Sequence, residues 1–517
     1  MSREGALIKN PYQRLSPEQL ELVHNTSLKL LENPGVLFYS REAALLLEEA
    51  GAELTATKEG ESDAWWVSIP PELVKKALDT APSRVVLGAR DPENAVELDA
   101  GTGARKVHFG TGSETNIWVE LSPETFVSEA NPDHKRTFPA FNRRRGTVED
   151  LCRSAQLADQ LENLDFFIRN VNIQDPDITE ENKDVNKFFA SLNNITKHVM
   201  GGLTDFRQLD KVVRMAELAA GGREELKKNP VISFITSVIK SPLQVVDETA
   251  EKLMAVSRME IPVVISSSPQ GGSTAPINEA GMIAQVNAEV LTGVIINQLA
   301  FPGAPVIYGA VPVRARMDNL HDMYGVPEFF QYTTACAQLA HSYGIPCYST
   351  AGVGDAKVPG VQAAAEKMYT HASVPSAGPD LVHYSFGLLE KTQAFSPEQA
   401  LLDNHHIGMV KAMYREAEVS GETMDEVEKT VKEVMQSAHR LYARHARRFL
   451  RRGSIFPSYP FEGELEDQDE TLLNAHQKVQ ELFSQPANHL PRKTVEEIFN
   501  EVPGILPRLN PYGGEKE

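Results

Sequence analysis

The sequence predicts an α/β fold, a (β/α)8 TIM barrel with α-rich N-terminal and C-terminal extensions. The first observation is a series of eight short apolar runs that begins near residue 105. The second is that segments with the apolar periodicity of a helix separate these runs. Runs that are apolar along their whole length are typical of parallel strands covered by helices. The runs are 106–110, 165–170, 197–202, 231–236, 262–267, 305–310, 345–350 and 380–385.

The clearest helix between two runs is expected from Thr147 to Leu161. Thr147 is a good N-cap, and Asp150 stands at the third helical position, where it completes a capping box. Eight strand and helix units in roughly 300 residues favour a barrel, which needs about that length. An open doubly wound sheet is the alternative.

The chain divides into three predicted regions. Residues 1–104 are expected to be an α-rich N-terminal region, 105–418 the TIM-barrel catalytic domain, and 419–517 a helical C-terminal extension. Within the last region, 421–453 is predicted as one long helix. The six arginines from Arg440 to Arg452 give it a basic end. A solvated or intersubunit surface is favoured there over a docking site for an acidic partner.

Composition excludes several classes of protein. The formal charge of −20 over 517 residues disfavours nucleic-acid binding, because phosphates would be repelled over most of the surface. The N-terminus has no apolar signal core. The longest uncharged run, 290–313, is interrupted by polar residues and is predicted as a buried helix followed by a buried strand, so no membrane span is expected. Three cysteines without a CxxC pair favour a cytoplasmic location.

Several common catalytic motifs are absent. The sequence lacks GxxxxGK[ST], HExxH and GxSxG, which argues against a P-loop, a zincin and a nucleophile elbow. His405 and His406 are adjacent and would point in different directions on a helix. No metal site is therefore predicted.

Small and polar residues cluster after the apolar runs. In a (β/α)8 barrel the active site lies at the carboxyl ends of the strands. We therefore expect a wide mouth there, suited to a large, flat partner. The residues at these positions include Gly110, Thr111, Arg169, Asn170, Gly201, Gly202, Gln270, Gly272, Tyr308, Tyr348, Gly352, Val353, Gly354, His383 and Tyr384.

The chain resembles the trimethylamine methyltransferase superfamily, and within it the branch that lacks pyrrolysine, which includes glycine betaine:corrinoid methyltransferases. The resemblance rests on VHFGTGSETNIW (107–118), the long segment that begins SSSPQGGSTAP (266–299), PGAPVIYGAVP (302–312), STAGVGDAKVPGVQAAAEKM (349–368) and LLDNHHIGMVK (401–411). It implies transfer of a methyl group from a methylated amine to cob(I)alamin carried by a separate corrinoid protein, and it implies a homo-oligomer.

One departure from the trimethylamine enzymes indicates the substrate. Their pyrrolysine corresponds to a position in or beside Gly352–Gly354, where this chain has only standard residues. A tertiary amine would leave as an amide anion unless its nitrogen were first activated, whereas a quaternary amine leaves as a neutral tertiary amine. A quaternary amine, most simply glycine betaine, is therefore the expected substrate. The bare loop is expected to leave room for the corrin.

Roles for individual residues follow from this resemblance and from placement at strand ends. Aromatic faces suit an ammonium whose charge fades in the transition state. The ammonium wall is expected from Phe109, Tyr308, Tyr348 and Tyr384. A substrate carboxylate is expected at Arg169, Asn170, Arg314 or His383. Positioning is expected from Tyr348, Gly352, Val353, Gly354 and Asp355. Contacts to the corrin are expected from Gly110, Thr111, Gly201, Gly202, Gln270 and Gly272.

Several alternatives remain open at this point. Proline betaine, carnitine or gamma-butyrobetaine could replace glycine betaine in the same chemistry. A metal-dependent hydrolase or lyase on the same barrel would need a His/Asp/Glu cluster converging from several strands. A non-catalytic binder of quaternary ammonium compounds is the third possibility.

Overall fold

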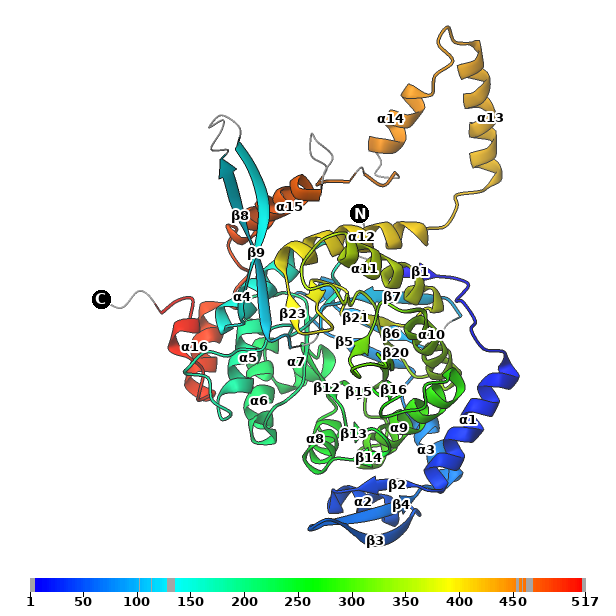
Figure 1. Cartoon of the computed structure of the whole chain (residues 1–517), viewed down its shortest axis with the longest axis vertical. Helices are drawn as coiled ribbons and strands as arrows, with labels where there is room; N and C mark the ends of the chain where they lie inside the picture. Colours follow the sequence, from blue (N-terminus) through cyan, green and yellow to red (C-terminus); the bar gives the residue numbers. More distant parts are fainter. Residues whose placement is uncertain are drawn as a thin grey trace.

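A curled sheet of parallel strands forms the centre of the computed structural model, which describes residues 5–101, 103–112, 114–127, 135–451, 455–457, 459–461 and 468–513 (Figure 1). Eight of the nine strands of this sheet run parallel to one another. They coincide with the eight apolar runs, so the strand prediction is confirmed. The eight are β7 (Arg105–Phe109), β10 (Phe166–Ile168), β11 (His198–Gly201), β12 (Ile232–Thr236), β15 (Val263–Ser267), β17 (Val306–Ala310), β20 (Cys347–Thr350) and β21 (Leu381–His383).

The order of these strands follows the chain from β10 to β21, and β7 pairs with β21. Among the described strands the order does not reverse, as it would in a doubly wound sheet. On its other side, β7 pairs antiparallel with β1 (Ala6–Ile8). The carboxyl end of β7 also reaches β10. A parallel bridge joins Gly110, which follows β7, to Phe166 of β10, and the Asp165 N–H donates to the Phe109 carbonyl at 2.7 Å. β7 therefore contacts both ends of the row, β21 and β10.

A helix follows each parallel strand and covers the outside of the sheet (Figure 1). α4 begins with the predicted capping box between Thr147 and Asp150. Among the described residues one helix, α9, has the length and composition of a membrane span, and 83% of its apolar window is buried inside the protein. The helices are α4 (Val148–Gln160), α5 (Lys183–Leu192), α6 (Leu209–Ala220), α7 (Arg223–Lys228), α8 (Asp247–Arg258), α9 (Glu279–Ala300), α10 (Pro327–Ser342), α11 (Val361–Ser373) and α12 (Pro397–Met413).

Short additional strands lie at the carboxyl edge of the sheet, because they belong to the loops that follow the parallel strands. The largest such addition is the hairpin of β8 (Ile117–Val127) and β9 (Lys135–Arg145), which projects from the body (Figure 1). The shorter strands are β13 (Ile239–Lys240), β14 (Gln244–Val245), β16 (Gln270–Gly271), β18 (Val313–Ala315), β19 (Asp322–Met323), β22 (Leu388–Leu389) and β23 (Ala394–Phe395).

The N-terminal region is mixed α/β, whereas the sequence analysis expected it to be α-rich. It contains the predicted helices, but also a hairpin that turns at Gly60, where φ is +65° and glycine is favoured. A second strand pair packs inside the curled sheet. The elements are α1 (Pro17–Glu32), α2 (Arg41–Glu49), α3 (Pro71–Thr80), β2 (Val36–Phe38), β3 (Glu53–Glu59), β4 (Ser62–Ser68), β5 (Arg84–Leu87) and β6 (Val96–Asp99).

The prediction of one long helix over 421–453 is wrong. α13 (Gly421–Gln436) ends before Ser437, whose hydroxyl donates to the Val434 carbonyl and accepts from the Arg440 N–H. Such local bonds compete with the helix. The chain resumes as α14 (Ala443–Arg451), and Arg452 lies outside the described residues. Both helices project away from the body (Figure 1). α15 (Gln468–Phe483) and α16 (Arg492–Glu501) pack back against it.

Side chains alternate between two layers along each parallel strand. An inner cluster joins β5 and β6 to residues of six parallel strands, among them Phe166, Met200 and Tyr348. An outer cluster contains their neighbours, such as Phe167 and Cys347, packed against the helices. The inner side of the sheet is therefore filled at its centre, and polar groups begin where the strands end.

Replacing Gly110 by alanine should lower the thermal unfolding midpoint. A Cβ at this position would overlap the ring of Phe166 where β7 meets β10. Overpacking of this kind costs about 1–3 kcal/mol. Adding Phe166→Leu should recover part of the loss, because it frees space. Gly421→Ala is the control, since no atom lies within 4 Å of the added Cβ. An unchanged midpoint in Gly110→Ala, measured by circular dichroism, would contradict the contact.

Candidate functional site

Three aromatic rings stack at the carboxyl ends of β20 and β21. The ring centroids of Tyr348 and His383 are 4.0 Å apart, and those of His383 and Tyr384 are 3.7 Å apart. The Tyr348 hydroxyl is hydrogen-bonded to Nδ1 of His383, and the Thr350 hydroxyl to Nε2. Both imidazole nitrogens are thus fixed by β20. We call Tyr348, His383 and Tyr384 the aromatic wall.

The aromatic wall is uncharged at neutral pH. Burial lowers the pKa of His383 well below its usual value. Burial also raises the pKa of Tyr348 well above its usual value. Neutral aromatic faces attract cations through the ring quadrupole. The wall can therefore contact an ammonium group without placing a formal charge beside it.

Charged residues gather at the neighbouring strand end. Arg169, directly after β10, forms an ion pair with the Glu114 carboxylate, in which Nη2 lies 3.0 Å from a carboxylate oxygen, and Nη2 donates to the Gly202 carbonyl. Lys187 of α5 binds the other oxygen of Glu114. The guanidinium also lies over the ring of Phe188, 4.5 Å from its centroid. We call Glu114, Arg169 and Lys187 the Arg169 cluster.

The Arg169 cluster has an excess of positive charge and unused donors. Burial lowers the pKa of Lys187 to about 8, so at neutral pH Lys187 and Arg169 are both charged and contact the one carboxylate of Glu114, while the charge of Asp184 also acts on Lys187. Burial alone would raise the pKa of Glu114, but Arg169 and Lys187 lower it on balance. Nε and Nη1 of Arg169 are buried and have no hydrogen-bond partner among the described residues. An unpaired buried donor costs about 1–3 kcal/mol. The cluster is therefore suited to bind one further anion.

One short loop connects the aromatic wall to the Arg169 cluster. The Thr111 hydroxyl donates to the Ile168 carbonyl at 2.7 Å and accepts from the Ile168 N–H at 2.9 Å, next to Arg169. A Cβ at Gly112 would lie 2.5 Å from the Tyr384 ring. The segment 110–112 is thus held against both groups, and its small residues allow this close packing.

Two aromatic residues expected in the ammonium wall face the helices instead. The Phe109 ring lies 5.7 Å from Nζ of Lys411 on α12. The Tyr308 hydroxyl donates to Asn287 on α9 at 3.0 Å. Both belong to the outer cluster. Neither lies on the inner side of the sheet, and the function proposed below uses neither.

Two residues expected to hold a carboxylate have other partners. The side-chain oxygen of Asn170 accepts from the Ser154 hydroxyl at 2.8 Å, so this amide points toward α4. Arg314 in β18 lies 3.6 Å from the carboxylate of Glu328 on α10. Of the predicted carboxylate ligands, only Arg169 combines full burial with excess positive charge.

The residues expected to contact the corrin each have an internal role. A Cβ at Gly201 would collide with the Arg169 side chain, just as one at Gly110 would collide with Phe166. The Gln270 amide donates to the Leu320 carbonyl and to Asp322, both at 2.7 Å. Gly272 has a φ of +91°, which glycine tolerates. Contact with the corrin stays a prediction for these residues and for Thr111 and Gly202.

The loop after β20 is packed rather than empty. Gly352 has a φ of +83°, and a Cβ there would collide with the His371 imidazole. Its N–H donates to the Thr370 hydroxyl at 2.9 Å. Val353 is buried, and the Gly354 carbonyl accepts from the Lys391 N–H at 3.0 Å. Helix α11 thus occupies the space at Gly352 that the sequence analysis assigned to the corrin.

Asp355 follows in the same loop and is half-buried. Its N–H donates to the Glu366 carboxylate at 2.7 Å. Burial raises the pKa of the Asp355 carboxyl, and one of its oxygens has no partner among the described residues.

Sequence reasoning missed Lys187, and it placed Thr350 only among the residues at a strand end, without a role. Lys187 is followed in its helix by the apolar and small residues 188–192, and a lysine beside such a run is the one signal that could have revealed it. The contact of Thr350 with His383 gave no signal, because the two residues are 33 positions apart in sequence. Neither contact is encoded in local spacing.

The sequence matches the family model described as trimethylamine methyltransferase (MTTB) over residues 5–453. A trimethylamine methyltransferase of Desulfitobacterium hafniense (strain DSM 10664 / DCB-2) is 31% identical over 409 residues, which are 79% of this chain and 76% of the relative. A glycine betaine methyltransferase of D. hafniense (strain Y51) is 27% identical over 514 residues, 98% of each chain. Among solved structures, a dihydropteroate synthase in complex with pteroic acid from Coxiella burnetii is 12% identical, with a TM-score of 0.35, over 64% of this chain and 98% of that chain.

The match spans nearly the whole described chain and includes both groups of residues at the strand ends. It confirms the resemblance on which the sequence analysis relied. The chain belongs to the trimethylamine methyltransferase family and is an enzyme that transfers methyl groups from methylated amines.

Proposed function

We propose that this enzyme moves a methyl group from a quaternary amine to cob(I)alamin on a separate corrinoid protein. Glycine betaine is the proposed amine. The proposal includes a closed (β/α)8 barrel, supported by the contacts of β7 with both β21 and β10. The similarity to a glycine betaine methyltransferase over 98% of the chain supports the choice of substrate.

The observation that best supports this proposal is that Nε and Nη1 of the buried Arg169 guanidinium have no hydrogen-bond partner among the described residues. With Lys187 charged, the cluster lacks one negative charge. A betaine carboxylate would supply that charge and accept from the free donors, and hydrogen bonds to charged groups contribute about 1.5–3 kcal/mol. Trimethylamine has no carboxylate. This feature therefore favours a betaine within a family that acts on methylated amines.

The aromatic wall would hold the other end of the substrate. When the methyl carbon passes to cobalt, its bond to nitrogen breaks and the electron pair stays on nitrogen, which leaves as a neutral amine. The positive charge on the substrate nitrogen disappears in this step. A protein carboxylate placed against that nitrogen would therefore stabilise the ground state more than the transition state. The neutral rings of Tyr348 and Tyr384 avoid that penalty and would aim the methyl group.

The partners follow from the same reaction. Cob(I)alamin is the acceptor substrate, and the corrinoid protein would approach the carboxyl edge of the sheet, beside the Gly352–Asp355 loop. We also propose self-association, supported by the exposed Met424, Val427 and Val431, whose spacing places them on one side of α13. A cytoplasmic location remains part of this proposal.

Arg169→Met should raise KM for glycine betaine about tenfold to a hundredfold, because it removes a charge-assisted contact to the carboxylate. It should leave KM for tetramethylammonium, which has no carboxylate, unchanged. The loss of cob(I)alamin absorbance measures KM for glycine betaine and for tetramethylammonium. The same assay with a panel that includes proline betaine and carnitine tests the proposed function.

The control for this variant is Arg153→Met on α4, where the guanidinium lies over Phe483 at 4.3 Å. It should change neither constant. An equal rise for glycine betaine and tetramethylammonium in Arg169→Met would contradict a carboxylate site at Arg169. No methyl transfer from any quaternary amine in the wild type would refute the proposed function itself.

Tyr384→Leu should lower kcat/KM about 2-fold to 30-fold for both glycine betaine and tetramethylammonium. The cation and ring contact that it removes contributes about 0.5–2 kcal/mol. Tyr384→Phe keeps the ring and should retain most of the activity. The two variants are compared in the same cob(I)alamin assay. Equal losses in both would assign the effect to the hydroxyl, against a role for the aromatic face.

KM for glycine betaine should rise as the pH passes about 8, the lowered pKa of Lys187. A lysine is charged below its pKa, so the cluster loses one positive charge above it. KM for tetramethylammonium should stay flat, because that ligand makes no contact with the cluster. In Lys187→Arg the rise should vanish, since arginine stays protonated. A glycine betaine profile that is flat to pH values well above the Lys187 pKa would argue against the charge requirement.

A further inference from the structure

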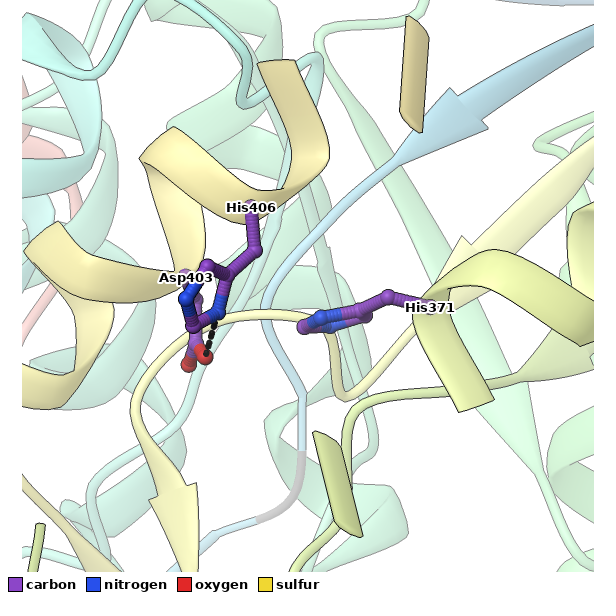
Figure 2. A group of neighbouring side chains, drawn as sticks. All are labelled: His371, Asp403 and His406. Atoms are coloured by element: carbon purple, nitrogen blue, oxygen red, sulfur yellow. Dashed lines mark ion pairs between the residues drawn. The ribbon is translucent and has the colours of Figure 1, made fainter. Parts of the chain in front are cut away.

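Three side chains with metal-binding atoms lie behind the loops of the carboxyl edge. His371 extends from α11, and Asp403 and His406 extend from α12 (Figure 2). One nitrogen or carboxylate oxygen from each lies within 4.8 Å of those of the other two. His371 and Asp403 are fully buried, and His406 is nearly so.

The hydrogen bond of His371 fixes its tautomer. Nε2 lies 3.0 Å from the Ser385 carbonyl oxygen. A carbonyl can only accept, so Nε2 carries the hydrogen and Nδ1 presents a lone pair. Nδ1 is buried and has no partner in the part of the chain that the structure describes. Histidines that bind metals commonly donate their other N–H to a backbone carbonyl in this way.

The other two residues are also prepared as ligands. Nδ1 of His406 is buried, has no hydrogen-bond partner among the residues described, and lies 4.0 Å from an oxygen of Asp403. That oxygen accepts from the Gln399 amide at 2.9 Å, and the second oxygen accepts from the Gly387 N–H at 2.8 Å. These bonds orient the carboxylate. Burial lowers the pKa of His406 to about 4, which leaves a neutral imidazole.

We propose that His371, Asp403 and His406 bind a divalent zinc ion that joins α11 to α12 behind the loop at Gly352. Two imidazoles and one carboxylate are an established ligand set for zinc. In a tetrahedral site the ligand atoms are about 3.4 Å apart. Small side-chain rotations would close the 4.8 Å spread. Three protein ligands leave the fourth position of a tetrahedral zinc to a water molecule. The site stands apart from the proposed methyl-transfer function.

The ammonium of Lys367 is the main force opposing this site. Nζ lies 3.1 Å from the Asp403 oxygen that Gly387 also contacts, and it donates to the carbonyls of Gly352 and Leu388. An ammonium and a dication at this distance repel each other. Zinc at Asp403 would therefore have to move this ammonium away from the carboxylate, toward the carbonyls of Gly352 and Leu388.

The test uses zinc with the full-length protein. After zinc loading and dialysis against buffer, elemental analysis of the wild type should find about one zinc per chain. Zinc should also raise its thermal unfolding midpoint, because a ligand that binds only the folded state stabilises it. His406→Ala should weaken zinc binding more than about tenfold and abolish the thermal shift.

The matched control is His405→Ala, which removes the adjacent histidine of the same helix. His405 packs against Phe456 and Tyr459 and points away from the cluster, as its sequence position predicted. It should bind zinc as the wild type does. No zinc in the dialysed wild type, or equal zinc in wild type and His406→Ala, would overturn the proposal.

A second variant keeps the test independent of folding defects. Lys367→Met removes the competing ammonium beside Asp403 and leaves all three ligands in place, so it should bind zinc more tightly than the wild type. Without zinc this variant should be less stable than the wild type, because Asp403 loses its buried partner. Weaker zinc binding in Lys367→Met would count against the site.

Discussion

The alternation of side chains along eight parallel strands is the constraint on which the site depends. Each step of one residue moves a side chain from the inner side of the sheet to the helical layer. Tyr348 therefore lies inside while its neighbour Cys347 packs outward, and His383 lies inside while Val382 packs outward. Because the strands end together at one edge, their last inner residues meet. The contact between Tyr348 and His383 results from this geometry, whereas Tyr384 follows β21 and reaches the His383 ring through a backbone φ of +64°.

Buried charges divide the carboxyl edge into a structural part and a part prepared for a ligand. Nζ of Lys367 has three partners, Asp403 and the carbonyls of Gly352 and Leu388, which use all its hydrogens. It needs nothing further. Arg169 is equally buried, yet two of its N–H groups have no partner. A protein interior rarely leaves such donors unpaired unless a ligand or water completes them. The contrast explains why we assign substrate binding to Arg169 and a loop-holding role to Lys367.

The sequence predicted the positions of strands and helices well, but it predicted poorly which way individual side chains point. All eight parallel strands and the capping box of α4 could be predicted, because apolar runs and N-cap residues are local signals. The residues after each strand could also be named. Which of them face inward could not be predicted reliably, since this depends on the residue at which each strand begins. Phe109 and Tyr308 sit one residue away from the inner register and so face the helices.

Contacts between distant elements were beyond sequence reasoning for a different reason. Glu114 and Lys187 lie 73 residues apart, and no spacing rule joins them. The same holds for His371 and His406, which come from different helices. Gly352 illustrates the consequence. Its lack of a side chain was interpreted as room for a large partner, whereas the space beside it is occupied by the imidazole of His371. A glycine shows that space is needed, but only the structure shows which atoms use it.

For the proposed betaine substrate, the separation of its two charged ends follows from the chemistry of methyl transfer. A positive cluster close to the departing nitrogen would repel the substrate ammonium, and a negative one would hold it in the ground state. The structure places neutral rings at β20 and β21 and the excess positive charge at β10 and α5. The loop segment 110–112 spans the distance between them and contacts both. In the proposed complex, strong binding at the betaine carboxylate would orient a substrate whose reacting end is held only by aromatic faces, so binding energy would not oppose the loss of charge.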